Sequence, residues 1–261
     1  MKRLLAPAFV LAAIGTLAPL AWVLRLSLYR RGGMAGERQY EILFYEPGTW
    51  TMENYSQILS EPFYRGTLLF TLGLGVLVTV IAITVGWVLA WGLHSCRPGS
   101  RAALAALIVL PKFTNIIVFV FGLKMMFGAN GLLPVVGGEV WMLAPYAALT
   151  ITAALAASPV HLTEAARGLG AGPFAAFWFV SFRLALPGTL AATLMVLVWS
   201  LGAFVAPYLL GSPRQYTAGV IVDRLTNSDL NWALAAALDV VLMAVAAALG
   251  LFVSRIRRWL R

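Results

Sequence analysis

The chain has 261 residues, of which 61% are apolar and only 11% are charged, and its mean hydropathy is +0.86. Soluble globular domains are about 45–50% apolar and about 25% charged, so a soluble chain of this composition would expose large apolar patches to water. The composition therefore excludes an ordinary soluble domain and predicts an integral membrane protein. The net charge of +9 then raises the question of which side of the membrane the basic residues occupy.

Apolar runs that are long enough to cross a bilayer occur six times, since about 20 helical residues span a hydrocarbon core of about 30 Å. We expect an all-α fold with one transmembrane domain over residues 1–261. Its six helices are predicted at about residues 4–24, 67–93, 102–123, 140–160, 184–210 and 232–254. The first run is longer than the apolar region of a secretory leader and is followed by Arg25, so we expect it to be retained as a membrane helix.

The basic residues predict how the helices are oriented. With both termini inside, the inner segments are residues 1–3, 94–101, 161–183 and 255–261. These segments carry ten Lys and Arg residues and a single acid, Glu164, whereas the charges of the rest of the chain cancel. Because Lys and Arg near span ends concentrate on the cytoplasmic side, this distribution predicts an N-in, C-in topology.

The inner loop between the fourth and fifth predicted helices, residues 159–180, is the most informative segment. Ser158 and Pro159 suit the N-cap and first position of a helix. Gly170 is suited to end that helix in the left-handed conformation, and Gly172-Pro173 to begin another. Taken alone, this pattern describes a connector between two membrane helices.

The spacing of Glu164-Ala165-Ala166, Gly170 and Val180 resembles the EAA loop of ATP-binding-cassette importer permeases with the MetI-like fold. The chain departs from the family at Phe182-Arg183, where a hydrophobic-Pro pair is usual. A second such pair, Leu186-Pro187, is present and implies a helix break near the fifth span. Two further segments, residues 50–55 and 202–211, resemble the spermidine/putrescine-type subfamily, in the first of its two unlike permease subunits.

This resemblance implies a function for the loop and a set of partners. The loop would form a coupling helix that docks on a cytoplasmic ATPase, through Glu164, Ala165, Ala166, Arg167, Gly170 and Pro173. The partners would be an unlike second permease subunit, two ATPase subunits, a periplasmic or lipid-anchored solute-binding protein and membrane lipid, but no nucleic acid. The chain would lie in a bacterial-type cytoplasmic (inner) membrane as a multi-pass protein.

The chain is not expected to be an enzyme or to bind a cofactor itself, with ATP and Mg bound by the ATPase. A P-loop requires a Gly-Lys pair, and none of Lys2, Lys112 and Lys124 follows a glycine. We expect no metal site either, because His94 and Cys96 are only two ligands without a second cluster.

Two charged residues, Lys112 and Asp239, lie inside predicted membrane helices, where a charge is costly and often functional. Together with Phe204 they are candidates for the solute pathway. In the alternative interpretation Lys112 and Asp239 pair with each other, or either one faces a water-filled cavity without touching solute.

Two other functions are considered beside an ATP-driven importer. A secondary transporter usually carries internal repeats, which we do not find, and an intramembrane enzyme has only Lys112 and Asp239 as candidate groups. The resemblance suggests a polyamine as the solute, and other small charged molecules remain alternatives.

Overall fold

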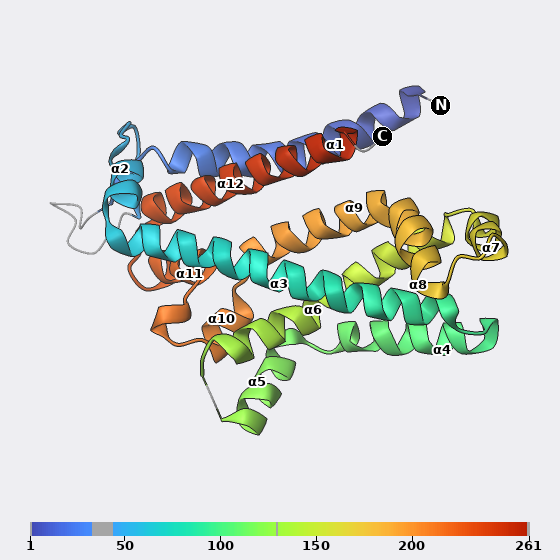
Figure 1. Ribbon diagram of the computed structural model, residues 1–261. Helices are drawn as coiled ribbons and strands as arrows, with labels where there is room; N and C mark the ends of the chain where they lie inside the picture. The colour runs from blue at the N-terminus through green and yellow to red at the C-terminus, as the bar shows by residue number, and fades with distance from the viewer. Residues whose placement is uncertain (1, 33–43, 129, 260–261) are drawn as a thin grey trace, which may run out of the picture. The chain divides into compact units, whose positions relative to one another are not determined.

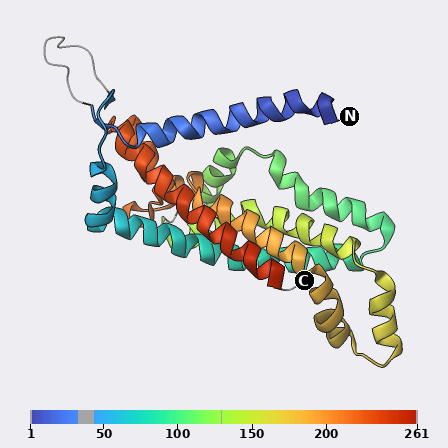
Figure 2. The same ribbon diagram turned by 90° about the horizontal axis from the view of Figure 1, so that it is seen from above.

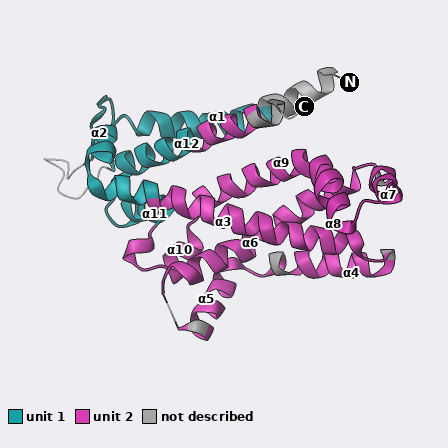
Figure 3. Ribbon diagram, viewed as in Figure 1, with its two compact units in different colours: residues 1–69, 217–245 teal, residues 70–216, 246–261 magenta. Residues whose placement is uncertain are grey.

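The computed structural model describes residues 2–32, 44–128 and 130–259 and is almost entirely helical (Figure 1). The one sheet in these ranges is an antiparallel pair of two-residue strands, β1 (Arg30–Arg31) and β2 (Tyr45–Glu46). The chain divides into two compact units, residues 1–69 with 217–245 and residues 70–216 with 246–261 (Figure 3).

The first unit is held together by α2 and the end of α1. Asn54 is buried on α2, and its Nδ2 donates to the Ser27 oxygen at 2.9 Å and to the Tyr29 oxygen at 2.8 Å. These two bonds satisfy carbonyls that follow the last turn of α1, where no helical partner is available. The unit contains α1 (Lys2–Leu26), α2 (Glu53–Ser60), the start of α3 (Pro62–Ser95), α11 (Ala218–Asn227) and the first part of α12 (Trp232–Trp259).

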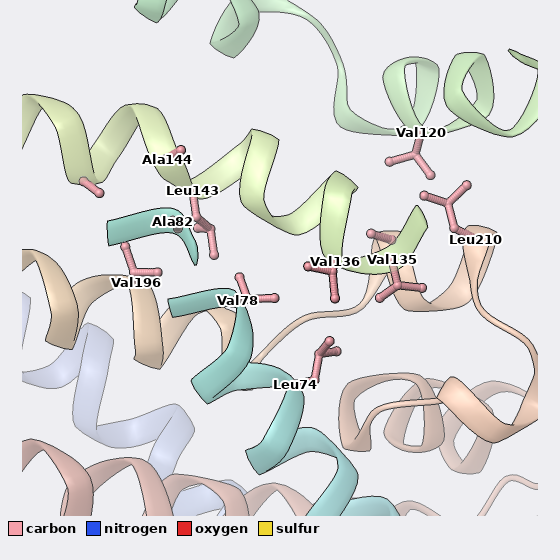
Figure 4. Packing of buried hydrophobic residues seen from close by; sticks show 12 residues of the cluster. Leu74, Val78, Ala82, Val120, Val135, Val136, Leu143, Ala144, Val196 and Leu210 are labelled. Atoms are coloured by element: carbon pink, nitrogen blue, oxygen red, sulfur yellow. The ribbon is translucent and has the colours of Figure 1, made fainter. Parts of the chain in front are cut away.

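The second unit holds the rest of α3 and the other long helices. Its elements are α4 (Pro98–Val109), η1 (Leu110–Phe113), α5 (Ile116–Phe127), α6 (Leu132–Ala156), α7 (Val160–Gly168), α8 (Pro173–Ala176), the π-helical turn η2 (Phe177–Ser181), α9 (Phe182–Leu201), α10 (Val205–Leu210), η3 (Pro213–Gln215) and the end of α12. Its hydrophobic core gathers side chains of α3, α5, α6, α9 and α10 around α6 (Figure 4).

Small residues allow α3 and α6 to approach closely. A Cβ atom added to Gly86 of α3 would lie 2.7 Å from the Ala147 Cβ and 3.1 Å from the Ala148 nitrogen of α6. Membrane helices associate through such small residues because lipid supplies no hydrophobic drive between them. Gly86, Ala147 and Ala148 therefore allow α3 and α6 to pack at this short distance.

Four described helices are long and apolar enough to cross a membrane, namely Pro62–Ser95, Leu132–Ala156, Pro173–Leu201 and Trp232–Arg255. Shorter apolar helices within the described ranges are Ala13–Leu26, Gly99–Val109 and Ile116–Met126. The multi-helix membrane fold is confirmed. The run predicted at 102–123 is divided by η1, as its internal Pro111 and Lys112 suggested, and the run predicted at 184–210 is divided after Leu201.

The helix break predicted at Leu186 and Pro187 is wrong. α9 continues from Phe182 to Leu201 with Pro187 inside it. Proline removes its own N–H donation from a helix and crowds the carbonyl four residues earlier, and membrane helices tolerate this where their surroundings compensate. The irregularity lies earlier, in the π-helical turn, where the Phe182 N–H bonds to the Phe177 oxygen.

Candidate functional site

The loop between α6 and α9 folds as two helices separated by a tight turn. α7 begins at Val160 with Pro159 as its N-cap, one residue later than predicted. The difference arises because the Ser158 hydroxyl donates back to the Ala154 oxygen at 3.0 Å and so serves the end of α6. α8 begins as expected, with Gly172 as N-cap and Pro173 at the first helical position.

Gly170 ends α7 in the left-handed conformation, as predicted, with φ of +91°. The Gly170 N–H bonds to the Arg167 oxygen and the Ala171 N–H to the Ala166 oxygen, both at 3.0 Å. This pair of bonds is the Schellman arrangement, which satisfies the last carbonyls of a helix. The turn therefore gives α7 a defined end before the chain returns to the membrane helices.

A cavity of about 370 Å³, with both polar and apolar side chains in its walls, lies beside α7. Its walls come from the end of α3, the end of α6, α7 and the π-helical turn, and both ribbon views place α7 beside that end of α3 (Figures 1 and 2). The lining residues are Trp91, His94, Ser95, Leu155, Ser158, Pro159, Thr163, Glu164, Arg167 and Ser181. Across the cavity wall, the Thr163 and Ser181 hydroxyl oxygens are 3.4 Å apart.

The structure gathers some of the predicted coupling residues at this cavity. Glu164 and Arg167 line it together with His94, and both are largely exposed. Ala165 is exposed and Ala166 is half-buried on the same helix. Neither alanine is part of the cavity lining, and the same holds for the two turn residues of the predicted set, Gly170 and Pro173.

The three candidate pathway residues lie in different parts of the fold. The backbone of Lys112 belongs to η1, but its side chain is outside the described part of the chain. Phe204 precedes α10 in the second unit and stacks on Tyr208, with ring centroids 5.4 Å apart. Asp239 belongs to the first unit, where it is half-buried on α12 directly after a run of buried residues, 233–238.

Sequence reasoning missed two features of the second unit. Thr163 and Ser181 both line the cavity. Only Thr163 could have been found from the sequence, because it lies one helical turn before Arg167 and therefore on the same face of α7. The span predicted at residues 140–160 also leaves out Glu139. It lies inside α6 with only 1% of its surface exposed, and the apolar residues on both sides of it in the sequence are the signal that indicates a continuous helix.

Comparison with known proteins gives a consistent result. The sequence profile described as "Binding-protein-dependent transport system inner membrane component" matches residues 82–261. Spermidine/putrescine transport system permease protein PotB of Haemophilus influenzae is 29% identical over 219 residues, 75% of this chain and 76% of that protein. PotB of Escherichia coli is 25% identical over 75% of this chain and 78% of its own length.

Solved structures agree on the fold. A bacterial ABC transporter involved in the import of the acidic polysaccharide alginate aligns with a TM-score of 0.74 at 16% identity, covering 98% of this chain and 94% of the other. The MetNI methionine ABC transporter aligns with a TM-score of 0.68 at 21% identity, covering 77% of this chain and 99% of the other. With its apolar helices and the matched profile, the chain belongs to the family of inner membrane components of binding-protein-dependent transport systems, the permease subunits of ABC importers.

Proposed function

We propose that α7 and the turn at Gly170 couple this permease to a separate cytoplasmic ATPase that binds ATP and Mg. The observation that carries the proposal is a short, largely exposed helix that ends at a defined turn and lines a cavity together with the ends of α3 and α6. Because α7 packs on α8 and on the π-helical turn before α9, a docked protein that displaces α7 can move α9 with it. The side-specific distribution of basic residues supports an N-in, C-in topology, which places this loop in the cytoplasm.

The complete importer, in this proposal, contains an unlike second permease subunit, two ATPase subunits and a periplasmic or lipid-anchored solute-binding protein. The family description supports the binding protein, since it names a binding-protein-dependent system. Relatives that transport spermidine and putrescine support a polyamine as the solute. The half-buried Asp239 on a membrane helix is the chain's candidate for contact with a cationic solute.

The coupling role is tested with Glu164→Lys and Gly170→Val. The first reverses a charge on α7 itself, and the second places a β-branched residue where φ is +91°. Both variants are expected to insert into the membrane normally and to lose ATP-dependent uptake of labelled spermidine, measured in proteoliposomes with the complete complex. Gly99→Val is the matched control, because Gly99 is exposed at the start of α4 with nothing within 4 Å of an added Cβ.

Normal ATP-dependent uptake by both variants would refute the role of the loop. Uptake that needs no ATP in the wild-type complex would instead support a secondary transporter. Competition with unlabelled putrescine, trehalose and an organic acid then identifies the solute class, and a polyamine solute predicts that only putrescine competes.

A further inference from the structure

A pocket of about 400 Å³ lies in the first unit, where residues that follow α1, residues of α2 and the residue before α12 meet. This volume is within the range of ligand sites, about 300–1,000 Å³. All of its lining residues are polar or charged, namely Arg30, Arg31, Glu53, Asn54, Gln57 and Asn231. The proposed coupling role of α7 uses none of these side chains.

Two of the lining residues are buried asparagines, each with one side-chain atom that has no partner in the described part of the chain. Asn54 is 5% exposed and Asn231 is 6% exposed. The Asn54 Nδ2 donates to the Ser27 and Tyr29 oxygens, which uses both of its hydrogens and leaves Oδ1 as an acceptor. The Asn231 Oδ1 accepts from the Leu234 N–H at 3.2 Å, which leaves Nδ2 as a donor. Neither remaining atom is fully enclosed by protein, so both reach the pocket that their residues line.

The hydrogen-bond acceptors of the pocket come from α2. Glu53 contributes a carboxylate, and Asn54 contributes the Oδ1 atom just described. Gln57 lies four residues after Glu53 and therefore on the same face of the helix. Its Nε2 donates to the Glu61 Oε1 at 2.8 Å, so its own Oε1 is an acceptor as well. This side of the pocket is therefore suited to a ligand group that donates hydrogen bonds and carries positive charge.

The hydrogen-bond donors come from other segments. Arg30 and Arg31 of β1 contribute guanidinium groups, and Asn231 contributes its Nδ2. The Arg31 Nη2 also donates to the Asp229 oxygen at 3.4 Å, which ties β1 to the segment before α12. Within the ranges that the structure describes, neither guanidinium forms an ion pair with the Glu53 carboxylate. Opposite charges thus line one pocket without neutralising each other by direct contact.

From this arrangement we propose that the pocket binds a compact zwitterion, which carries a phosphate or carboxylate group and an ammonium group. Arg30, Arg31 and the Asn231 Nδ2 bind the anionic group, because guanidinium groups form strong paired bonds with phosphate and carboxylate. The ammonium group donates to the Glu53 carboxylate and the Asn54 Oδ1. A polyamine does not fit, because it has no anionic group to place against the two arginines. The site is therefore separate from that of the proposed solute.

Two sources can supply such a zwitterion. The pocket lies where α1 ends and where α3 and α12 begin, all of them apolar helices, and the ends of membrane helices lie at the level of the lipid headgroups. Trp50, a residue type enriched at that level, is 66% exposed and packs edge to face on Tyr29 with ring centroids 5.9 Å apart. The headgroup of phosphatidylethanolamine combines phosphate with a primary ammonium group, and a soluble amino acid combines carboxylate with ammonium.

Binding is tested by native mass spectrometry of the purified, delipidated transporter complex. The probes are phosphatidylethanolamine and two soluble zwitterions, O-phosphoethanolamine and β-alanine. Saturable binding of the lipid without binding of the soluble probes supports a lipid ligand, and the reverse supports a soluble one. Phosphatidylcholine, which has no N–H to donate, and phosphatidylglycerol, which has no ammonium group, are the matched lipids. We expect both to bind about tenfold more weakly than phosphatidylethanolamine, since each loses bonds to a charged group.

Three changes in the pocket remove one partner group each. The double change Arg30→Gln with Arg31→Gln removes the charge that binds the anionic group, and Glu53→Gln removes the charge that binds the ammonium group. Asn231→Asp keeps the Oδ1 acceptor at the start of α12 and replaces the free donor with an oxygen. Each is expected to weaken binding of the zwitterion about tenfold. Arg65→Gln is the matched control, because Arg65 is an exposed arginine of the same unit and does not line the pocket.

Several results would overturn the proposal. One is the absence of binding by every zwitterionic probe, and another is binding that the three pocket changes leave at the wild-type affinity. Phosphatidylglycerol or phosphatidylcholine that binds as tightly as phosphatidylethanolamine would also overturn it, because the ligand would then need no ammonium donor at Glu53. All of these results leave the coupling function standing, since that function is tested separately by ATP-dependent uptake.

Discussion

The contact between α9 and α6 at Gly188 provides a sharp test of the packing. A Cβ atom added at Gly188 would overlap the Ala154 Cβ, and the Ala154 Cα and the Thr150 oxygen would lie 3.6 and 3.7 Å away. Carbon atoms pack best at about 3.5–4.0 Å. Because alanine has no flexible side-chain end, Gly188→Ala can be accommodated only if the two helix backbones separate.

The expected cost follows from two opposing effects. Overpacking a tight interior costs about 1–3 kcal/mol, and we take the upper end because the neighbouring atom cannot rotate away. Replacing glycine with alanine inside a helix returns about 1 kcal/mol. The free energy of unfolding of Gly188→Ala is therefore expected to fall by about 2 kcal/mol, the difference between these values.

Unfolding in mixed detergent micelles with increasing SDS, followed by tryptophan fluorescence, measures this change. Ala154→Gly in the Gly188→Ala background removes the overlapping atom and is expected to restore much of the loss. Gly73→Ala is the control, because Gly73 lies on α3 with nothing within 4 Å of an added Cβ. If Gly188→Ala is as stable as the wild type, or if Ala154→Gly gives no recovery, the close approach of α6 and α9 is not a determinant of stability.

Three further predictions concern other parts of the chain. Asn54→Leu is expected to lower the free energy of unfolding by about 1–3 kcal/mol for each of the two carbonyls that lose the Asn54 donor, as measured by SDS titration against the exposed control Ser56→Ala. Pro187→Ala is expected to retain wild-type or higher stability by the same titration, because α9 already continues through this position; a marked loss would show that the proline shapes the helix. If Asp239 contacts a cationic solute, Asp239→Asn raises the KM for spermidine uptake, whereas an unchanged KM and maximal rate would refute a pathway role.

The membrane class and the helix–turn–helix form of residues 159–180 could be predicted from the sequence because both are local properties. A run such as Leu132–Ala156 is apolar whatever surrounds it, and Gly170 and Pro173 have conformational preferences that act within one turn. Charge was a less reliable guide to helix ends. The predicted span begins at about residue 140, directly after Glu139, yet α6 includes this residue, since burial inside a packed unit is decided by neighbouring helices.

The effect of Pro187 also depends on context. A proline followed by glycine is a frequent helix boundary in sequence, but α9 continues through both residues against α6, with Gly188 at the contact. The helical hydrogen bonding is irregular earlier, in the π-helical turn before α9. No local sequence pattern distinguishes a helix break at Pro187 from a helix that continues through it, because the result depends on how closely α6 approaches α9.

The sequence by itself determined that the chain enters a membrane as several apolar helices and where the Glu164-Ala165-Ala166 motif lies, because composition and short-range spacing carry that information. Only the tertiary structure decided which residues from other helices lie next to this motif. The cavity behind α7 joins residues of α3, α6 and the π-helical turn that are far apart in the chain, and their meeting is set by packing between helices.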